Sequence, residues 1–228
     1  MPFYVDFAAI SIDEYKAKLE NADLVPSRQL LKKNTTEVFN KLEACGIKNT
    51  EDLFNALKTK ARVQNFAQKS AIDENYLTIL IRELKGYRQP PVKIKDFPEL
   101  SKEAIHSLES IGIKNTLQLY EHIKNQTSRR HLAIKTKLDY DTILTLARLT
   151  DLSRARWVNH TFAYVLINSG IHSIEELAHT SIDLLHQKIN DTNRRLNLNN
   201  GKIGKHDMKL TIDAARELPI EVDFNDSK

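Results

Sequence analysis

The nine residues CGIKNTEDL, at positions 45–53, return as IGIKNTLQL at 111–119 and, with more changes, as SGIHSIEEL at 169–177. Each copy places a glycine where a helix can end, because glycine adopts the left-handed conformation at low cost. An isoleucine follows, placed to pack back on the helix just ended. Next comes a residue suited to a helix N-cap, with a capping-box partner three positions later: Asn49 and Asp52, Asn115 and Gln118, Ser173 and Glu176. Each stretch therefore predicts a reversal between two short helices.

The repetition extends well beyond these nine residues. When the chain is aligned with itself at an offset of 66 residues, positions 37–82 match positions 103–148 without a gap, and 15 of the 46 pairs are identical. Average composition would give about three identical pairs. The match indicates an internal duplication. A hairpin this small cannot bury its own apolar face, so we expect the copies to stack.

Length and composition favour a soluble, helix-rich protein. The chain has 228 residues, of which 28% are charged and 41% are apolar, as is usual for a globular protein. It has six glycines and six prolines, which argues against an all-β fold with many tight turns. A single cysteine excludes an internal disulfide, and the N-terminus does not resemble a signal peptide. The longest apolar run, FAYVLI at 162–167, is too short to span a membrane, so we expect a cytoplasmic protein.

The domain organisation follows from the repeats and from one linker. In GYRQPPVKIK, residues 86–95, the adjacent Pro90 and Pro91 cannot continue a helix. We predict an all-α fold of tandem repeats stacked into one or two helical lobes. The predicted segments are an N-terminal helical extension (1–25), repeat 1 (26–85), the linker (86–95), repeat 2 (96–151), repeat 3 with the C-terminal helices (152–218) and a frayed tail (219–228).

The repeated turns GIKNTEDL, GIKNTLQL and GIHSIEEL, with DLSRARWVNHTFAYVLINSGI at 151–171, resemble the helix-hairpin-helix superfamily. More narrowly, the chain is similar to an uncharacterised bacterial family, a domain of unknown function, that carries such hairpins in tandem. The resemblance covers about residues 27–196 and implies stacked helical hairpins. Related hairpins in repair enzymes and polymerases bind DNA backbones without reading sequence. The resemblance therefore implies a non-enzymatic protein that binds nucleic acid.

The chain departs from the superfamily's pattern at the phosphate-binding turn. Such hairpins usually hold a phosphate on a Gly-hydrophobic-Gly turn, whose N–H groups lie at a helix N-terminus. The matching triplets here are Lys33-Asn34-Thr35, Glu99-Leu100-Ser101 and Trp157-Val158-Asn159. None contains a glycine, and Glu99 would place a carboxylate where the phosphate should sit. DNA binding by the first two hairpins is therefore in doubt.

Basic residues cluster in one part of the chain. The net charge is only +4, but residues 124–156 hold eight Lys or Arg and three Asp, a local charge of +5. In the third hairpin, Arg154 and Arg156 are suited to phosphate, Asn159 can cap the helix or contact the phosphate, and Trp157 can stack on a base. The alternative is a core tryptophan beside a solvated basic face. The predicted nucleic-acid contacts are Arg129, Arg130, Arg154, Arg156, Asn159, Lys202 and Lys205.

Motifs for catalysis are missing from the sequence. It contains no G-x-x-x-x-G-K-[ST], G-x-G-x-x-G, H-E-x-x-H or C-x-x-C, so we predict no enzymatic activity, no cofactor and no metal site. Two functions stay open. The first is sequence-nonspecific binding of a DNA or RNA backbone, or of a nucleoprotein complex, with an affinity that falls steeply with salt. The second is a protein–protein interaction scaffold whose hairpins have lost phosphate binding, which the missing glycines favour.

Overall fold

The computed structural model describes residues 3–196 and 204–225. Within these ranges the chain forms helices and no β-strand, and its extended pairing is limited to two isolated bridges. The prediction of an all-α protein is confirmed. The described residues fall into two compact units, residues 5–88 (unit 1) and residues 3–4 with 89 onward (unit 2). The division lies inside the predicted linker.

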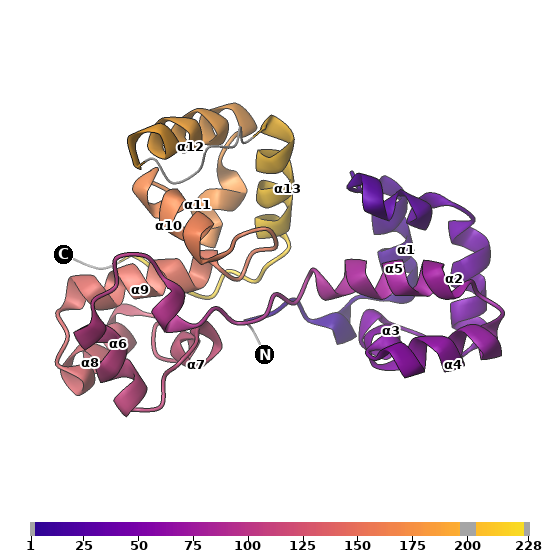
Figure 1. Ribbon diagram of the computed structural model, residues 1–228, viewed down its shortest axis with the longest axis horizontal. Coiled ribbons are helices and arrows are strands. Elements are labelled where there is room, and N and C mark those ends of the chain that lie inside the picture. The colour runs from indigo at the N-terminus through magenta and orange to yellow at the C-terminus, as the bar shows by residue number, and fades with distance from the viewer. Residues whose placement is uncertain (1–2, 197–203, 226–228) are drawn as a thin grey trace. The chain divides into compact units, whose positions relative to one another are not determined.

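Unit 1 is drawn in indigo to purple in Figure 1. Its elements are η1 Phe7–Ala9, α1 Ile12–Asn21, η2 Pro26–Lys32, α2 Thr35–Ala44, α3 Thr50–Leu57, α4 Lys60–Ser70 and α5 Glu74–Lys85. Helix α3 packs against α4 and α5, and α5 also packs against η2. The centre of this unit is formed by fully buried leucines, among them Leu42, Leu53, Leu57, Leu77 and Leu80.

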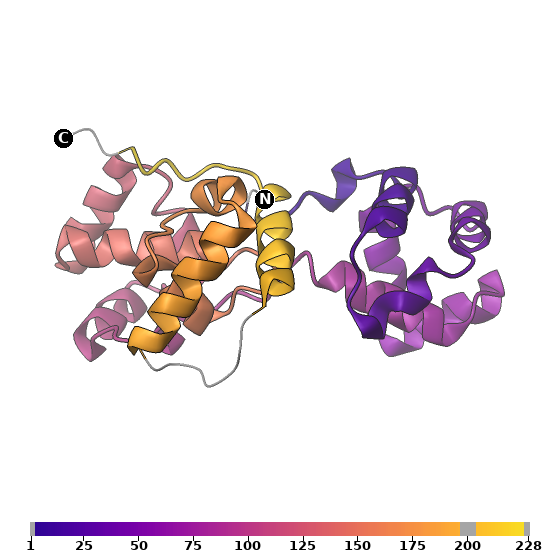
Figure 2. The ribbon, with the colours of Figure 1, turned by 90° about the horizontal axis from the view of Figure 1, so that it is seen from above.

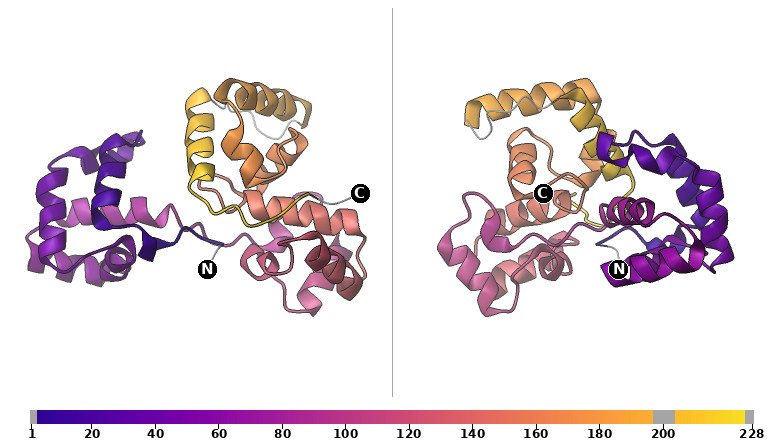
Figure 3. Two further views of the ribbon diagram at one scale, coloured as in Figure 1. Left: turned by 180° about the vertical axis from the view of Figure 1, so that it is seen from behind. Right: turned by 45° about the vertical axis from the view of Figure 1, so that its right-hand side comes forward.

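Unit 2 contains the remaining helices. Its elements are η3 Ile94–Asp96, α6 Lys102–Ser110, α7 Thr116–Tyr120, α8 Gln126–Thr136, α9 Tyr140–Leu152, α10 His160–Asn168, α11 Ile174–His179, α12 Ile182–Leu196 and α13 Lys205–Arg216. Helix α9 packs against α7, α8 and α10, while α13 packs against α11 and α12 (Figure 2; Figure 3). The predicted C-terminal helices are confirmed. No helix in the described ranges is long and apolar enough to cross a lipid bilayer.

The three glycine turns form as the sequence predicts. Gly46, Gly112 and Gly170 adopt left-handed φ angles of 87°, 88° and 74°. After each glycine, the isoleucine donates its N–H to a carbonyl in the last turns of the preceding helix: Ile47 to Leu42 (3.1 Å), Ile113 to Leu108 (3.0 Å) and Ile171 to Leu166 (3.0 Å). These bonds close the helix end in the Schellman geometry. The isoleucines are buried, so each turn holds two helices together.

The helix starts after these turns match the prediction in part. The side chains of Asn49, Asn115 and Ser173 each accept the N–H of the residue three positions on, as expected of N-caps. The reciprocal bond, however, reaches one residue further back than in a capping box. Asp52, Gln118 and Glu176 accept the N–H groups of Lys48, Lys114 and His172, at 3.0, 2.8 and 2.7 Å.

Replacing Gly112 with alanine tests the turn of α6 and α7. Nothing lies within 4 Å of a Cβ built there, so the cost comes from the left-handed backbone, and we expect unit 2 to lose about 1 kcal/mol of unfolding free energy. The measurement is urea denaturation followed by circular dichroism. The matched control is Gly86→Ala, because Gly86 has a φ of −60° and alanine adopts that angle freely. Equal losses in the two variants would contradict the assignment.

Each of the first two glycine turns is also hydrogen-bonded to a short segment that precedes its hairpin. In unit 1 the N–H of Ile12 donates to Lys48 and that of Thr50 to Ile10, at 2.9 and 3.0 Å. In unit 2 the N–H of Ile94 donates to Lys114 and that of Thr116 to Val92, at 3.0 and 2.9 Å. The third turn differs, because the N–H of Ile174 donates to the carboxylate of Asp151 at 2.8 Å.

Candidate nucleic-acid interface

Two of the predicted contacts, Arg129 and Arg154, lie inside unit 2. Arg129 is 0% exposed and Arg154 is 3% exposed. Neither guanidinium can reach a phosphate at the surface, so both are removed from the predicted interface. The physical reason is that each guanidinium has its hydrogen-bonding partners within the fold.

Arg154 connects several segments of unit 2. Its Nη1 donates to the Asp151 carboxylate at 2.8 Å and to the Tyr120 hydroxyl at 2.9 Å, and its Nη2 donates to the Pro219 carbonyl at 2.7 Å. The guanidinium also lies 4.9 Å from the centre of the Tyr120 ring. The other oxygen of Asp151 accepts the Ile174 N–H. The pair therefore joins α7, α9, the start of α11 and the C-terminal segment.

Burial changes the acidity of the groups around Arg154. Burial raises the pKa of the Asp151 carboxyl, and the Arg154 guanidinium and the Ile174 N–H oppose that rise. Burial also raises the pKa of the Tyr120 hydroxyl to about 12. Tyr120 is thus a neutral acceptor for Arg154 at ordinary pH. The cluster carries one ion pair that is closed off from solvent.

Arg129 anchors the end of the chain. It donates through Nη1 to the Ile123 carbonyl at 2.8 Å and through Nη2 to the Asp223 carbonyl at 2.9 Å. In return, the Asp223 N–H donates to the Lys124 carbonyl at 2.8 Å. Within the predicted tail, Asp223 is thus hydrogen-bonded to unit 2 through both its carbonyl and its N–H. Carbonyl acceptors for two buried arginines hold this segment against unit 2.

The internal alignment contained a signal for Arg129 that sequence reasoning missed. Arg129 lies 66 positions after Val63, and Val63 is buried in unit 1. A basic residue that aligns with a buried valine is expected on the inner face of its helix. Its charge suggested exposure, but its register indicated burial.

A similar signal existed for Arg154, which lies 66 positions after Arg88. The Arg88 guanidinium lies 3.8 Å from the ring centre of Phe7, 5.5 Å from that of Phe54 and 2.6 Å from the Glu51 carboxylate. Phe54 in turn lies 66 positions before Tyr120, so an arginine stacked on an aromatic side chain and paired with a carboxylate occurs in both units. This correspondence lies beyond the ungapped match, which ends at Arg82 and Arg148.

Two of the other predicted contacts, Arg130 and Lys205, lie on separate elements. Arg130 is exposed on α8, 5.9 Å from the centre of the Tyr140 ring. Lys205 is exposed at the start of α13 and is paired with Asp183 at 2.6 Å. Lys202 lies outside the described residues. Only Arg156 and Asn159 come from one segment, the turn between α9 and α10.

The α9–α10 turn combines a cation, an aromatic face and a helix N-terminus. Trp157 is 43% exposed and has a φ of 75°, and the Arg156 guanidinium lies 4.5 Å from the centre of its ring. Val158 is buried and anchors the turn. Asn159 caps α10 by accepting the Phe162 N–H at 2.8 Å. The alternative of a core tryptophan is therefore wrong.

The other two hairpins lack this combination at the start of their first helix. Helix α2 carries Glu37 in its first turn and α6 carries Glu103, whereas the first turn of α10 has no acid. Glu99 shares the left-handed backbone of Trp157. Burial of the Tyr164 hydroxyl raises its pKa, and a hydrogen bond with the Glu99 carboxylate raises that pKa further. Of these three helix starts, only that of α10 favours an anion.

The structure thus defines an all-helical protein with a candidate anion-binding turn. The part of the chain with described coordinates holds no group of three or more His, Cys, Asp or Glu placed to bind a metal. The family model "Domain of unknown function (DUF4332)" matches residues 98–218, just over half of the chain. The chain therefore belongs to this family, and the matched region includes α6 to α13. Searches of curated proteins and of solved structures returned no match.

Proposed function

We propose that unit 2 binds the backbone of a nucleic acid, without sequence preference, at the α9–α10 turn. The observation that carries the proposal is the Arg156 guanidinium stacked on the half-exposed ring of Trp157, beside the acid-free N-terminus of α10. Guanidinium groups pair with phosphate oxygens. The N-terminus of a helix attracts anions. These features together suit a phosphate that follows a stacked base.

The exposed tryptophan favours a single strand over a duplex. A base can stack on an aromatic side chain only when it has left its own stack, and every base offers a similar face. Recognition at Trp157 is therefore indifferent to sequence. The proposed contacts are to a base and a phosphate, which DNA and RNA share, so we expect both to bind.

We also propose that the chain contains three helix-hairpin-helix units in tandem, and that the α9–α10 turn begins the third of them. Three glycine turns with the same hydrogen bonds support this interpretation. So do the left-handed residues at Glu99 and Trp157, each two positions before the N-cap of its helix. In this interpretation only the third hairpin kept an anion-binding start.

Trp157 provides a direct measurement of binding because it is the single tryptophan of the chain. We expect its fluorescence to be quenched when the full chain is titrated with a single-stranded oligonucleotide of mixed sequence. With one phosphate contact, the affinity should fall about threefold between 50 and 200 mM salt. A duplex of the same sequence should bind more weakly.

Two variants locate the site. Arg156→Glu should lower the affinity at least about tenfold, since a charge that pairs with phosphate becomes one that repels it. The matched control is Arg194→Glu, which makes the same charge change on α12, where the side chain is 78% exposed. Parent-like binding by Arg156→Glu, or no salt-dependent binding by the parent, would refute the proposal.

A further inference from the structure

Helix α8 has a basic outer surface with an exposed apolar side chain near its C-terminal end. Ile134 is 79% exposed, and Arg130, His131 and Lys135 are exposed beside it. The helix itself contains no acidic residue. Asp139, the nearest acid along the chain, caps α9 through two hydrogen bonds to Thr142 at 2.7 Å. The surface therefore combines positive charge with uncovered apolar area.

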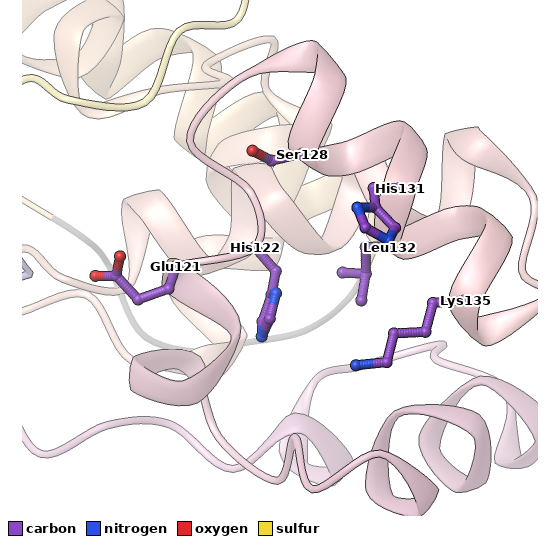
Figure 4. A pocket seen from close by; sticks show the side chains of 6 residues that line it. All are labelled: Glu121, His122, Ser128, His131, Leu132 and Lys135. Atoms are coloured by element: carbon purple, nitrogen blue, oxygen red, sulfur yellow. The ribbon is translucent and has the colours of Figure 1, made fainter.

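A cavity of about 160 Å³ opens beside this surface (Figure 4). It is lined by Glu121, His122, Ser128, His131, Leu132 and Lys135. Its four residues from α8 follow helical spacing along one face. Figure 4 shows the Lys135 side chain extending toward His122, while the Glu121 carboxylate lies at the opposite end. Glu121 is engaged there with Lys124 at 3.0 Å.

Unit 1 gives an internal comparison for this cavity. Arg62 lies 66 positions before Ser128, and its Nη1 donates to the Asn55 carbonyl at 2.5 Å. The guanidinium thus reaches across the place that corresponds to the cavity. Ser128 is too short to do so. Likewise, the position of Ile134 is occupied in unit 1 by the polar Gln68. At these two positions unit 2 therefore has a short hydroxyl and an exposed isoleucine, where unit 1 has a guanidinium and an amide.

We propose that α8 and this cavity bind an acidic segment of another protein. A side-chain carboxylate of the partner enters the cavity, where Lys135, Ser128 and the two imidazoles offer hydrogen bonds. An apolar side chain of the partner covers Ile134, and Arg130 faces further acidic residues. Charge complementarity selects the acidic partner, since α8 has cations and no anion. Ile134 favours a peptide over a nucleic acid, whose phosphates gain nothing from an apolar contact.

The test uses the full chain and a labelled twelve-residue peptide that alternates glutamate with leucine pairs, followed by fluorescence anisotropy. A peptide with lysine in place of every glutamate controls for apolar binding, and oligo(dT) competes as the nucleic acid. We expect the acidic peptide alone to bind. The double variant Ser128→Arg with Ile134→Gln, which installs the residues of unit 1, should weaken binding at least about tenfold, as loss of a central contact does.

The matched control is Gln68→Ala, on the corresponding face of α4, and circular dichroism checks that each variant is folded. Parent-like affinity in the double variant, equal binding of the lysine peptide, or no binding of the acidic peptide would overturn the proposal. If oligo(dT) displaces the acidic peptide from the parent but not from Arg156→Glu, the nucleic acid binds at the α9–α10 turn, and the assignment of α8 to the peptide is supported. Displacement from both would assign α8 to nucleic acid instead.

Discussion

Replacing Arg154 with alanine is expected to lower the unfolding free energy of unit 2 by about 3–5 kcal/mol. The Asp151 side chain is 4% exposed and that of Arg154 is 0% exposed. Removal of the guanidinium leaves a buried carboxylate without its charge partner, and it also takes a donor from Tyr120 and from Pro219. The cost comes from the charge left behind, because a buried pair in itself is close to neutral in net stability.

Trp157 makes this loss measurable for unit 2 alone, since its fluorescence reports unfolding of the unit that contains it. The matched control is Arg156→Ala, two positions along the chain, whose loss should stay below about 1 kcal/mol because its cation–π contact is partly exposed. A double variant lacking both Asp151 and Arg154 should lose less than the sum of the single variants. Additive losses, or a parent-like Arg154→Ala, would show that the two side chains are not coupled.

Ending the chain after Leu218 is expected to cost unit 2 about 4 kcal/mol. The cut removes two carbonyls, of Pro219 and Asp223, that accept from the buried arginines. It also removes Val222, which is 6% exposed. Two guanidinium groups are left with unmet hydrogen bonds inside the unit.

The measurement is urea denaturation followed by Trp157 fluorescence. The control is Glu221→Ala in the full-length chain, which removes an exposed carboxylate 3.8 Å from Lys124 and should cost under 1 kcal/mol. If the shortened chain unfolds at the urea concentration of the parent, the C-terminal segment contributes nothing to the fold. A loss equal to that of Glu221→Ala would assign its role to the surface charge alone.

Local features of the sequence were predictable because their cause lies within a few residues. Gly46 and Gly112 end a helix through their own backbone freedom, and Asn49 and Asn115 begin the next through their own side chains. None of these effects needs a distant partner. The division near residue 88 follows in the same way from adjacent prolines.

The candidate site was predicted less well because charge was taken as a sign of exposure. Arg154 and Arg156 have the same side chain two positions apart, yet one is buried and the other is only half-buried. What separates them is the Asp151 carboxylate, together with the Pro219 carbonyl from near the C-terminus. For Arg129, burial was predictable from the buried Val63, which lies 66 positions earlier. No sequence pattern predicted the cavity beside α8, because the cavity depends on the space left by the short side chain of Ser128.

The sequence by itself determined the helices and their turns, because short-range backbone preferences and apolar spacing are properties of neighbouring residues. Tertiary structure alone decided which cations are open to a ligand. Whether a guanidinium is buried depends on acceptors that folding brings from positions such as 151, 219 and 223, and no local pattern records their arrival.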